Sequence, residues 1–131
     1  MNTNICTSIK QSEKLIELGL DANTADMCWG INSSTRSYNN IPYLIPWKDY
    51  TCKEYYVPTW SLSALLELMP KYITEDNSSH IIRITPTFDN RIEMCYWDKT
   101  SGHILSNYIR ENTFIDAAFE MVCWLLENKK L

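Results

Sequence analysis

The chain has 131 residues, a length that indicates one domain, over residues 1–131, with room for a sizeable hydrophobic core. Its composition, 45% hydrophobic and 21% charged residues with three glycines, is typical of a folded globular protein and excludes a disordered chain. The net charge of −4, from 12 basic and 16 acidic residues, disfavours a protein that holds nucleic acid through a broad basic surface.

The cysteines and the N-terminus indicate a compartment. The five cysteines are odd in number, widely spaced and free of any C-x-x-C pair, which predicts buried reduced thiols. The N-terminal stretch MNTNICTSIKQSEK lacks the apolar run of a signal peptide, and no run in the chain approaches the ~20 residues that span a bilayer. We therefore expect a cytoplasmic protein that does not enter a membrane.

The first predicted element is a helix that begins after Ser8 and ends at Gly19. Ser8 and Gln11 form a capping box, and a glycine suits the left-handed position that follows a helix. The stretch LDANTADM then reads as a turn, because its Asp, Asn and Thr side chains can bond nearby backbone groups. The short aromatic run at 27–31 predicts a strand.

The middle of the chain is polar at first and then aromatic. Residues 32–40 lack periodicity and predict an exposed loop, whereas residues 38–60 combine seven aromatic residues with three prolines that block any helix. We expect one or two irregular strands in this segment, the clearer at 53–57.

The stretch PTWSLSALLELMP predicts a second helix, with Ser61 as its N-cap and Pro70 after its end. Trp60 lies just before the cap, where an apolar side chain packs onto Leu65 of the first helical turns. This structural role is the favoured interpretation of Trp60, and contact with a partner is the alternative.

Three β-rich runs in the second half, at 80–85, 91–97 and 103–109, predict an antiparallel meander, because turn-like sequences separate them. A simple hairpin closed by residues 98–102 would pair Trp97 with His103, Cys95 with Leu105 and Glu93 with Asn107. The core-facing side chains would then be Ile92, Met94, Tyr96, Ile104 and Tyr108.

The last predicted helix begins after Thr113, with Asp116 at the positive end of its dipole. Apolar residues recur along it at helical spacing, so it needs a surface to cover, and the meander supplies one. The sequence therefore predicts an α+β fold of two layers, in which an antiparallel β-meander packs against about three helices.

Three segments together resemble a family of short proteins that are encoded by phages, prophages and mobile elements of gut Bacteroidetes. They are KQSEKLIELGLDANTADM (10–27), VPTWSLSALLELMP (57–70) and IDAAFEMVCWLLENKKL (115–131), which match in the same order and cover somewhat over a third of the chain. The resemblance implies an accessory role for such an element inside its bacterial host, and it carries over no catalytic residue.

No pattern in the sequence reaches a catalytic or metal-binding signature. The two histidines, His80 and His103, fall short of the three or four ligands that zinc needs, although the predicted hairpin places Cys95 and His103 as diagonal neighbours on one face of the sheet. Turn and cap roles explain the paired carboxylates, and no glycine-rich phosphate loop is present. We expect no cofactor, no metal and no enzymatic activity.

Surplus aromatic residues with interleaved basic ones make residues 36–60 the candidate binding segment, although the same rings also suit buried irregular strands. The candidate residues are Arg36, Tyr38, Tyr43, Trp47, Lys48, Tyr50, Lys53 and Trp60. The first hypothesis is a protein-binding module, a host-factor modulator or an assembly component, and it is compatible with a homo-oligomer. The alternative is a single-stranded nucleic-acid binder that uses the same residues, which the net charge disfavours.

Overall fold

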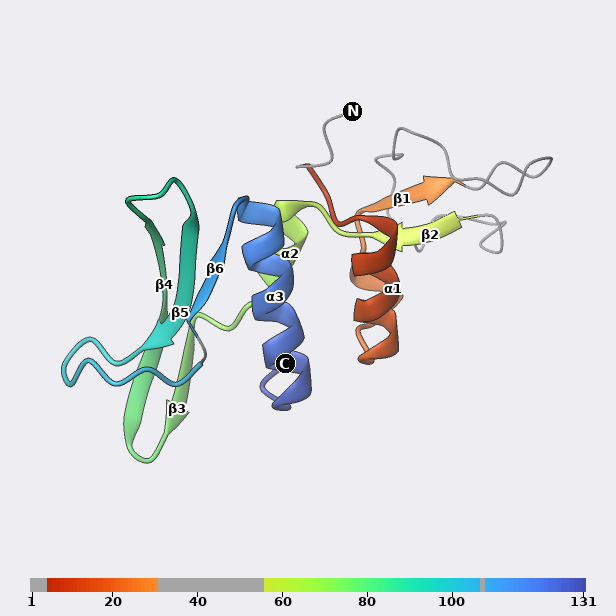
Figure 1. Ribbon diagram of the computed structural model, residues 1–131. Helices are drawn as coiled ribbons and strands as arrows, with labels where there is room; N and C mark the ends of the chain where they lie inside the picture. Colours follow the sequence, from red (N-terminus) through yellow and green to blue (C-terminus); the bar gives the residue numbers. More distant parts are fainter. Residues whose placement is uncertain (1–4, 31–55, 107) are drawn as a thin grey trace. The chain divides into compact units, whose positions relative to one another are not determined.

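The computed structural model describes residues 5–30, 56–106 and 108–131 (Figure 1). They form a mixed α+β fold, with helices α1, α2 and α3 and two antiparallel sheets of two and four strands. The predicted fold class, with its strand meander, is thus confirmed. The chain divides into two compact units, Met1–Leu66 and Glu67–Leu131, and each is described by itself. The single domain over residues 1–131 stays a prediction.

The first helix, α1 (Ile9–Glu17), has both of the predicted ends. The Ser8 hydroxyl accepts from the Gln11 amide at 3.1 Å, and the Gln11 side chain accepts from the Ser8 amide at 2.9 Å, which completes the capping box. At the other end Gly19 has a φ of +101°, and the Leu20 amide donates to the Leu15 carbonyl at 3.0 Å. This bond and the positive φ of Gly19 are typical of a Schellman motif, which satisfies carbonyls that the helix leaves without partners.

The first unit contains the two-stranded sheet. Strand β1 (Met27–Gly30) pairs antiparallel with β2 (Tyr56–Thr59), so that Cys28 lies opposite Pro58, and α1 contacts β2. The strand predicted at 27–31 is thus confirmed over Met27–Gly30. The one at 53–57 is described only from Tyr56 onward. Cys6 and two residues of β1, Met27 and Trp29, form a buried hydrophobic cluster, with Ile9 and Val57 packed against it.

Buried polar groups connect the start of α1 to the end of β2. The Thr7 hydroxyl lies 2.8 Å from the Ser12 hydroxyl and accepts from the Trp60 amide at 3.1 Å. The Thr7 amide in turn donates to the Trp60 carbonyl at 2.9 Å, and the Trp29 indole donates to the Thr7 carbonyl at 3.0 Å. Thr7, Ser12 and Trp60 are fully buried, so the Trp60 amide depends on the Thr7 hydroxyl for its partner, whereas the Ser12 hydroxyl also donates to the Ser8 carbonyl at 2.7 Å.

The second helix, α2 (Leu62–Leu68), begins after Ser61 as predicted. The Ser61 hydroxyl accepts from the Ala64 amide at 3.2 Å. Asp26, which lies far earlier in the chain, extends this cap, because its carboxylate accepts from both the amide and the hydroxyl of Ser61. The carboxylate therefore has a structural role at the positive end of the helix.

The second unit contains the four-stranded sheet, in the order β3 (Tyr72–Glu75), β4 (Ser78–Pro86), β5 (Ile92–Trp97) and β6 (Ile109–Glu111). Helix α3 (Phe114–Glu127) contacts β5 and β6, and the rings of Tyr96 and Trp124 stack with centroids 6.4 Å apart. Its Thr113 cap accepts from the Asp116 amide at 3.2 Å, as predicted.

Strand β3 is an addition to the predicted meander. A two-residue turn, Asp76 and Asn77, both with positive φ, joins it to β4.

The predicted register between residues 91–97 and 103–109 is wrong. Met94 lies opposite Ile109, whereas the simple hairpin places Ser106 there. The Ser106 hydroxyl accepts from the Tyr96 amide at 2.8 Å, so a side chain replaces a backbone carbonyl at this point of the ladder. The shift of three residues reverses the faces, because side chains alternate along a strand. Ile109 is therefore buried, and Tyr108, predicted to be in the core, is 53% exposed.

Helix α3 ends with a lysine in a conformation that favours glycine. Lys129 has a φ of +55°, and the Lys130 amide donates to the Leu125 carbonyl at 2.8 Å in a Schellman motif. Since a Cβ in this conformation costs about 1 kcal/mol, Lys129→Gly should raise the free energy of unfolding by about 0.5–1 kcal/mol in urea denaturation. Lys129→Ala keeps the Cβ and should give no gain. A glycine variant less stable than the alanine variant would contradict this explanation.

The four cysteines that the structure describes, Cys6, Cys28, Cys95 and Cys123, are free and buried. Burial, with a smaller contribution from Asp26, raises the pKa of the Cys6 thiol to about 11.

Among the described residues, no helix has both the length and the apolar character needed to cross a bilayer.

Candidate functional site

Seven of the eight predicted binding residues, Arg36, Tyr38, Tyr43, Trp47, Lys48, Tyr50 and Lys53, lie outside the described residues. The eighth, Trp60, is fully buried. Its indole nitrogen donates to the Thr24 hydroxyl at 2.9 Å, and its backbone bonds to Thr7. Trp60 is thus a buried residue and not part of an exposed binding surface, whereas its packing onto Leu65 stays a prediction. The described part of the chain offers another surface.

That surface is the face of the four-stranded sheet opposite α3. Because Tyr96 stacks on Trp124 of α3, strand alternation turns Glu93, Cys95 and Trp97 to the other face. The register adds Arg83, opposite Cys95 on β4, and Arg110, opposite Glu93 on β6. We call this surface the arginine face and define it by Arg83, Arg91, Glu93, Cys95, Trp97, Tyr108 and Arg110.

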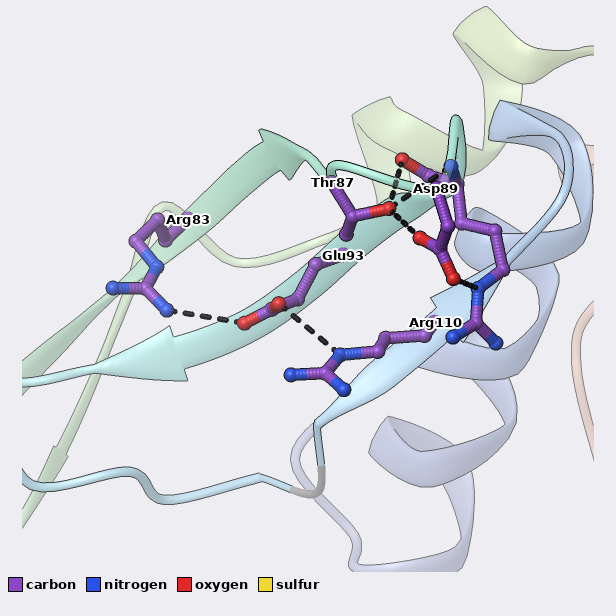
Figure 2. A network of polar contacts seen from close by, with 6 residues as sticks. Arg83, Thr87, Asp89, Glu93 and Arg110 are labelled. Carbon is purple, nitrogen blue, oxygen red and sulfur yellow. Dashed lines mark hydrogen bonds and ion pairs between the residues drawn. The ribbon is translucent and has the colours of Figure 1, made fainter.

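An ion-pair row crosses three strands of the arginine face. Glu93 accepts from Nη2 of Arg83 at 3.2 Å with one carboxylate oxygen and from Nε of Arg110 at 3.3 Å with the other. Figure 2 shows these three side chains in line across β4, β5 and β6. The Glu93 side chain is 13% exposed, so a carboxylate with little access to water separates two guanidinium groups.

We expect Glu93→Gln to lower the free energy of unfolding by about 1 kcal/mol, because the Arg83 and Arg110 charges would lose the carboxylate between them. Urea denaturation at low and high NaCl measures this loss, which should shrink at high salt as the repulsion between the arginines is screened. Glu111→Gln, at a position of β6 with no ion pair among the described residues, is the control. A loss independent of salt would contradict the electrostatic explanation.

Arg83 also lies near Trp97 and Cys95 on the arginine face. The guanidinium carbon of Arg83 lies 4.6 Å from the centre of the Trp97 ring. The fully buried Cys95 lies opposite Arg83 in the register of β4 and β5. Burial raises the pKa of the Cys95 thiol and outweighs the lowering by Arg83. The thiol thus stays protonated, and a protonated thiol is a poor nucleophile.

The two histidines contact each other. Nε2 of His80 lies 3.0 Å from Nδ1 of His103, and His80 is 2% exposed. His103 therefore has a histidine as its partner and not Cys95, the neighbour considered from the sequence. No group of three or more His, Cys, Asp or Glu side chains that could hold a metal ion occurs among the residues that the structure describes.

The turn between β4 and β5 is held by its own side chains. The Asn90 amide donates to the Thr87 carbonyl at 3.2 Å, and Asn90 has a φ of +61°, as in a three-residue hairpin loop. The Thr87 hydroxyl donates to Asp89, and Nε of Arg91 donates to the other Asp89 oxygen at 2.8 Å. The hydrogen bond from Thr87, together with Arg91, lowers the pKa of Asp89, so this carboxylate is charged at neutral pH.

Phe88 lies in this turn, and its side chain is fully exposed. Beside it is a hollow of about 530 Å³. The hollow is lined by Pro86, Thr87, Phe88, Asp89, Arg91, Glu93 and Arg110. It thus combines an exposed aromatic ring with two guanidinium groups, on a turn whose polar side chains are already bonded to one another.

The sequence contains a signal for this site that the turn prediction does not use. The stretch PTFDN is typical of a turn because of its Pro, Asp and Asn, and these residues leave its phenylalanine unexplained. A large apolar residue in such a turn cannot reach the core that the flanking strands build. Arg91 and Glu93, two residues apart, likewise predict a polar face, but only the register connects them with Arg110.

In comparisons with protein-family models, with curated proteins and with solved structures, none shows significant similarity to this chain.

Proposed function

We propose that this chain is a small non-enzymatic accessory protein of a phage or mobile element, acts in the cytoplasm of its bacterial host, and binds another protein. The resemblance of its helical segments to the Bacteroidetes element family supports the origin. The binding role is supported above all by the full exposure of Phe88, because an aromatic side chain in water has a cost that a partner's pocket removes.

The surroundings of Phe88 support the same role. Arginine and aromatic residues are enriched at protein interfaces, and the arginine face carries Arg83, Arg110 and the half-exposed Tyr108. The hydrogen bonds of the turn hold its backbone before binding, so less conformational entropy is lost when a partner docks.

Affinity capture from the host, followed by mass spectrometry, tests this proposal. The full chain serves as bait, together with Phe88→Ala and with Ile16→Ala, a control at an exposed apolar position of α1. We expect Phe88→Ala to reduce the captured partner at least about tenfold, which corresponds to the ~1.4 kcal/mol of an interface anchor, and Ile16→Ala to leave it unchanged. Equal capture by all three baits would contradict the proposed surface.

Binding of single-stranded nucleic acid is the second candidate. It is favoured by the exposed rings of Phe88 and Tyr108 beside arginines, since bases stack on such rings, and it is disfavoured by the net charge of −4. A fluorescence titration with an oligonucleotide at low and high salt distinguishes it, because binding through phosphates weakens steeply with salt.

A further inference from the structure

The hollow beside Phe88 has hydrogen-bond donors to spare. Arg91 uses its Nε for Asp89 at 2.8 Å, and Arg110 uses its Nε for Glu93 at 3.3 Å. Among the described residues, no acceptor contacts the terminal nitrogens of either guanidinium group. These nitrogens are the pair of parallel donors that suits the two oxygens of a carboxylate. The two intramolecular bonds also fix where the guanidinium planes lie.

The charge of the site suits a ligand with few negative charges. Among the residues that line the hollow, Arg91 and Arg110 contribute +2 and Asp89 and Glu93 contribute −2. Arg83, which lies outside the lining and is paired with Glu93, leaves a surplus of +1 for the site as a whole. The whole chain carries −4, so a polyanion such as nucleic acid would meet repulsion over the rest of the surface. A segment with one carboxylate balances the single surplus charge.

The apolar lining of the hollow defines the rest of the ligand. Phe88 and Pro86 line the hollow together with Arg91 and Arg110. The side chains of Phe88 and Pro86 are exposed. A leucine or aromatic side chain of the ligand, next to its carboxylate, would cover Phe88. We infer that the hollow binds a protein segment in which Asp or Glu adjoins a large apolar residue, an inference that rests on the protein-binding role proposed above.

The inference is tested by two-dimensional NMR of the full chain, with the Nε–H signals of Arg91 and Arg110 as local reporters. The probes are an acetylated, amidated Gly-Leu-Glu-Phe-Gly peptide and its analogue with Gln in place of Glu. We expect the Glu peptide to shift both arginine signals and to bind at least about fivefold more tightly than the Gln peptide, because the carboxylate offers two charged acceptor oxygens and the Gln amide offers one neutral oxygen. Equal affinities, or no arginine shifts up to about 10 mM peptide, would overturn the inference.

Two variants strengthen the test. Glu93→Gln raises the charge of the site from +1 to +2 and should tighten the Glu peptide severalfold, whereas Arg110→Gln should weaken it at least about fivefold. Both variants should change the affinity of the neutral Gln peptide by less than that of the Glu peptide, because the Gln peptide carries no charge. An unchanged Glu-peptide affinity in Arg110→Gln would overturn the inference, and so would an oligonucleotide or a phosphopeptide that shifts the arginine signals where the Glu peptide does not.

Failure of this inference and failure of the proposed function give different results. If Phe88→Ala abolishes partner capture but the Glu and Gln peptides bind equally, a protein interface is present and its acidic specificity is wrong. If Phe88→Ala leaves capture unchanged, the proposed function itself fails.

Discussion

Replacement of Thr7 by valine should lower the free energy of unfolding by about 2–3 kcal/mol, although valine has nearly the same shape. The Thr7 hydroxyl accepts from the buried Trp60 amide at 3.1 Å and lies 2.8 Å from the Ser12 hydroxyl. Valine removes the acceptor and leaves the Trp60 N–H without a partner, and a buried unsatisfied donor costs about 1–3 kcal/mol. The Ser12 hydroxyl loses one of its contacts as well.

Thr7→Ser is the matched control, because it keeps the hydroxyl and removes only a methyl group. We expect it to cost about 1 kcal/mol from the small cavity. Urea denaturation of the three proteins, compared by the midpoint at constant slope, measures both losses. If serine cost as much as valine, packing would explain the position of Thr7, and the hydrogen-bond explanation would be wrong.

The helix ends could be predicted from the sequence because their determinants are local. Ser8 and Gln11 are three residues apart, as are Thr113 and Asp116, and Gly19 adopts positive φ for lack of a Cβ. The Ser61 cap follows the same rule, but Asp26, whose carboxylate accepts from the Ser61 amide, lies 35 positions earlier in the chain. No spacing rule finds such a contact.

The strand pairings were less predictable because they depend on long-range choices. The pairing of β1 with β2 joins segments on either side of residues 31–55, and no turn sequence marks it. The register of β5 and β6 depends on one hydroxyl, since Ser106 inserts its side chain into the ladder and moves Ile109 opposite Met94. Counting residues across the loop cannot anticipate that insertion.

The candidate site escapes prediction for a compositional reason. Aromatic and basic residues are densest between Arg36 and Trp60, so composition favours that segment. The arginine face is instead assembled from three strands, of which β4 and β6 contribute one residue each and β5 contributes three. Phe88 stands alone in a polar turn, where a count of neighbouring aromatics gives no signal although its exposure makes it the clearest anchor.

The stability of the protein should fall by about 2–3 kcal/mol from Tyr96 alone as the pH rises from about 10 to about 12. Burial raises the pKa of Tyr96 from an ordinary 10.0 to about 12. Between these values an unfolded chain releases the phenolic proton and the folded chain keeps it. The contribution is therefore fully present below pH 10 and is lost as the pH rises through the folded value, at about 1.4 kcal/mol per unit of pKa difference.

Two variants distinguish this origin from a general effect of alkali. Tyr96→Phe should flatten the fall between about pH 10 and about pH 12 and should cost about 1 kcal/mol at neutral pH, because the phenol donates to the Pro70 carbonyl at 2.6 Å. Tyr72→Phe, at a position 64% exposed on β3, should change neither. Urea denaturation at a series of pH values measures the profiles. Cys6, with a pKa of about 11, adds a loss that begins about one pH unit lower, and Cys6→Ala should remove that earlier part. A fall that persists unchanged in Tyr96→Phe would show that another group carries it.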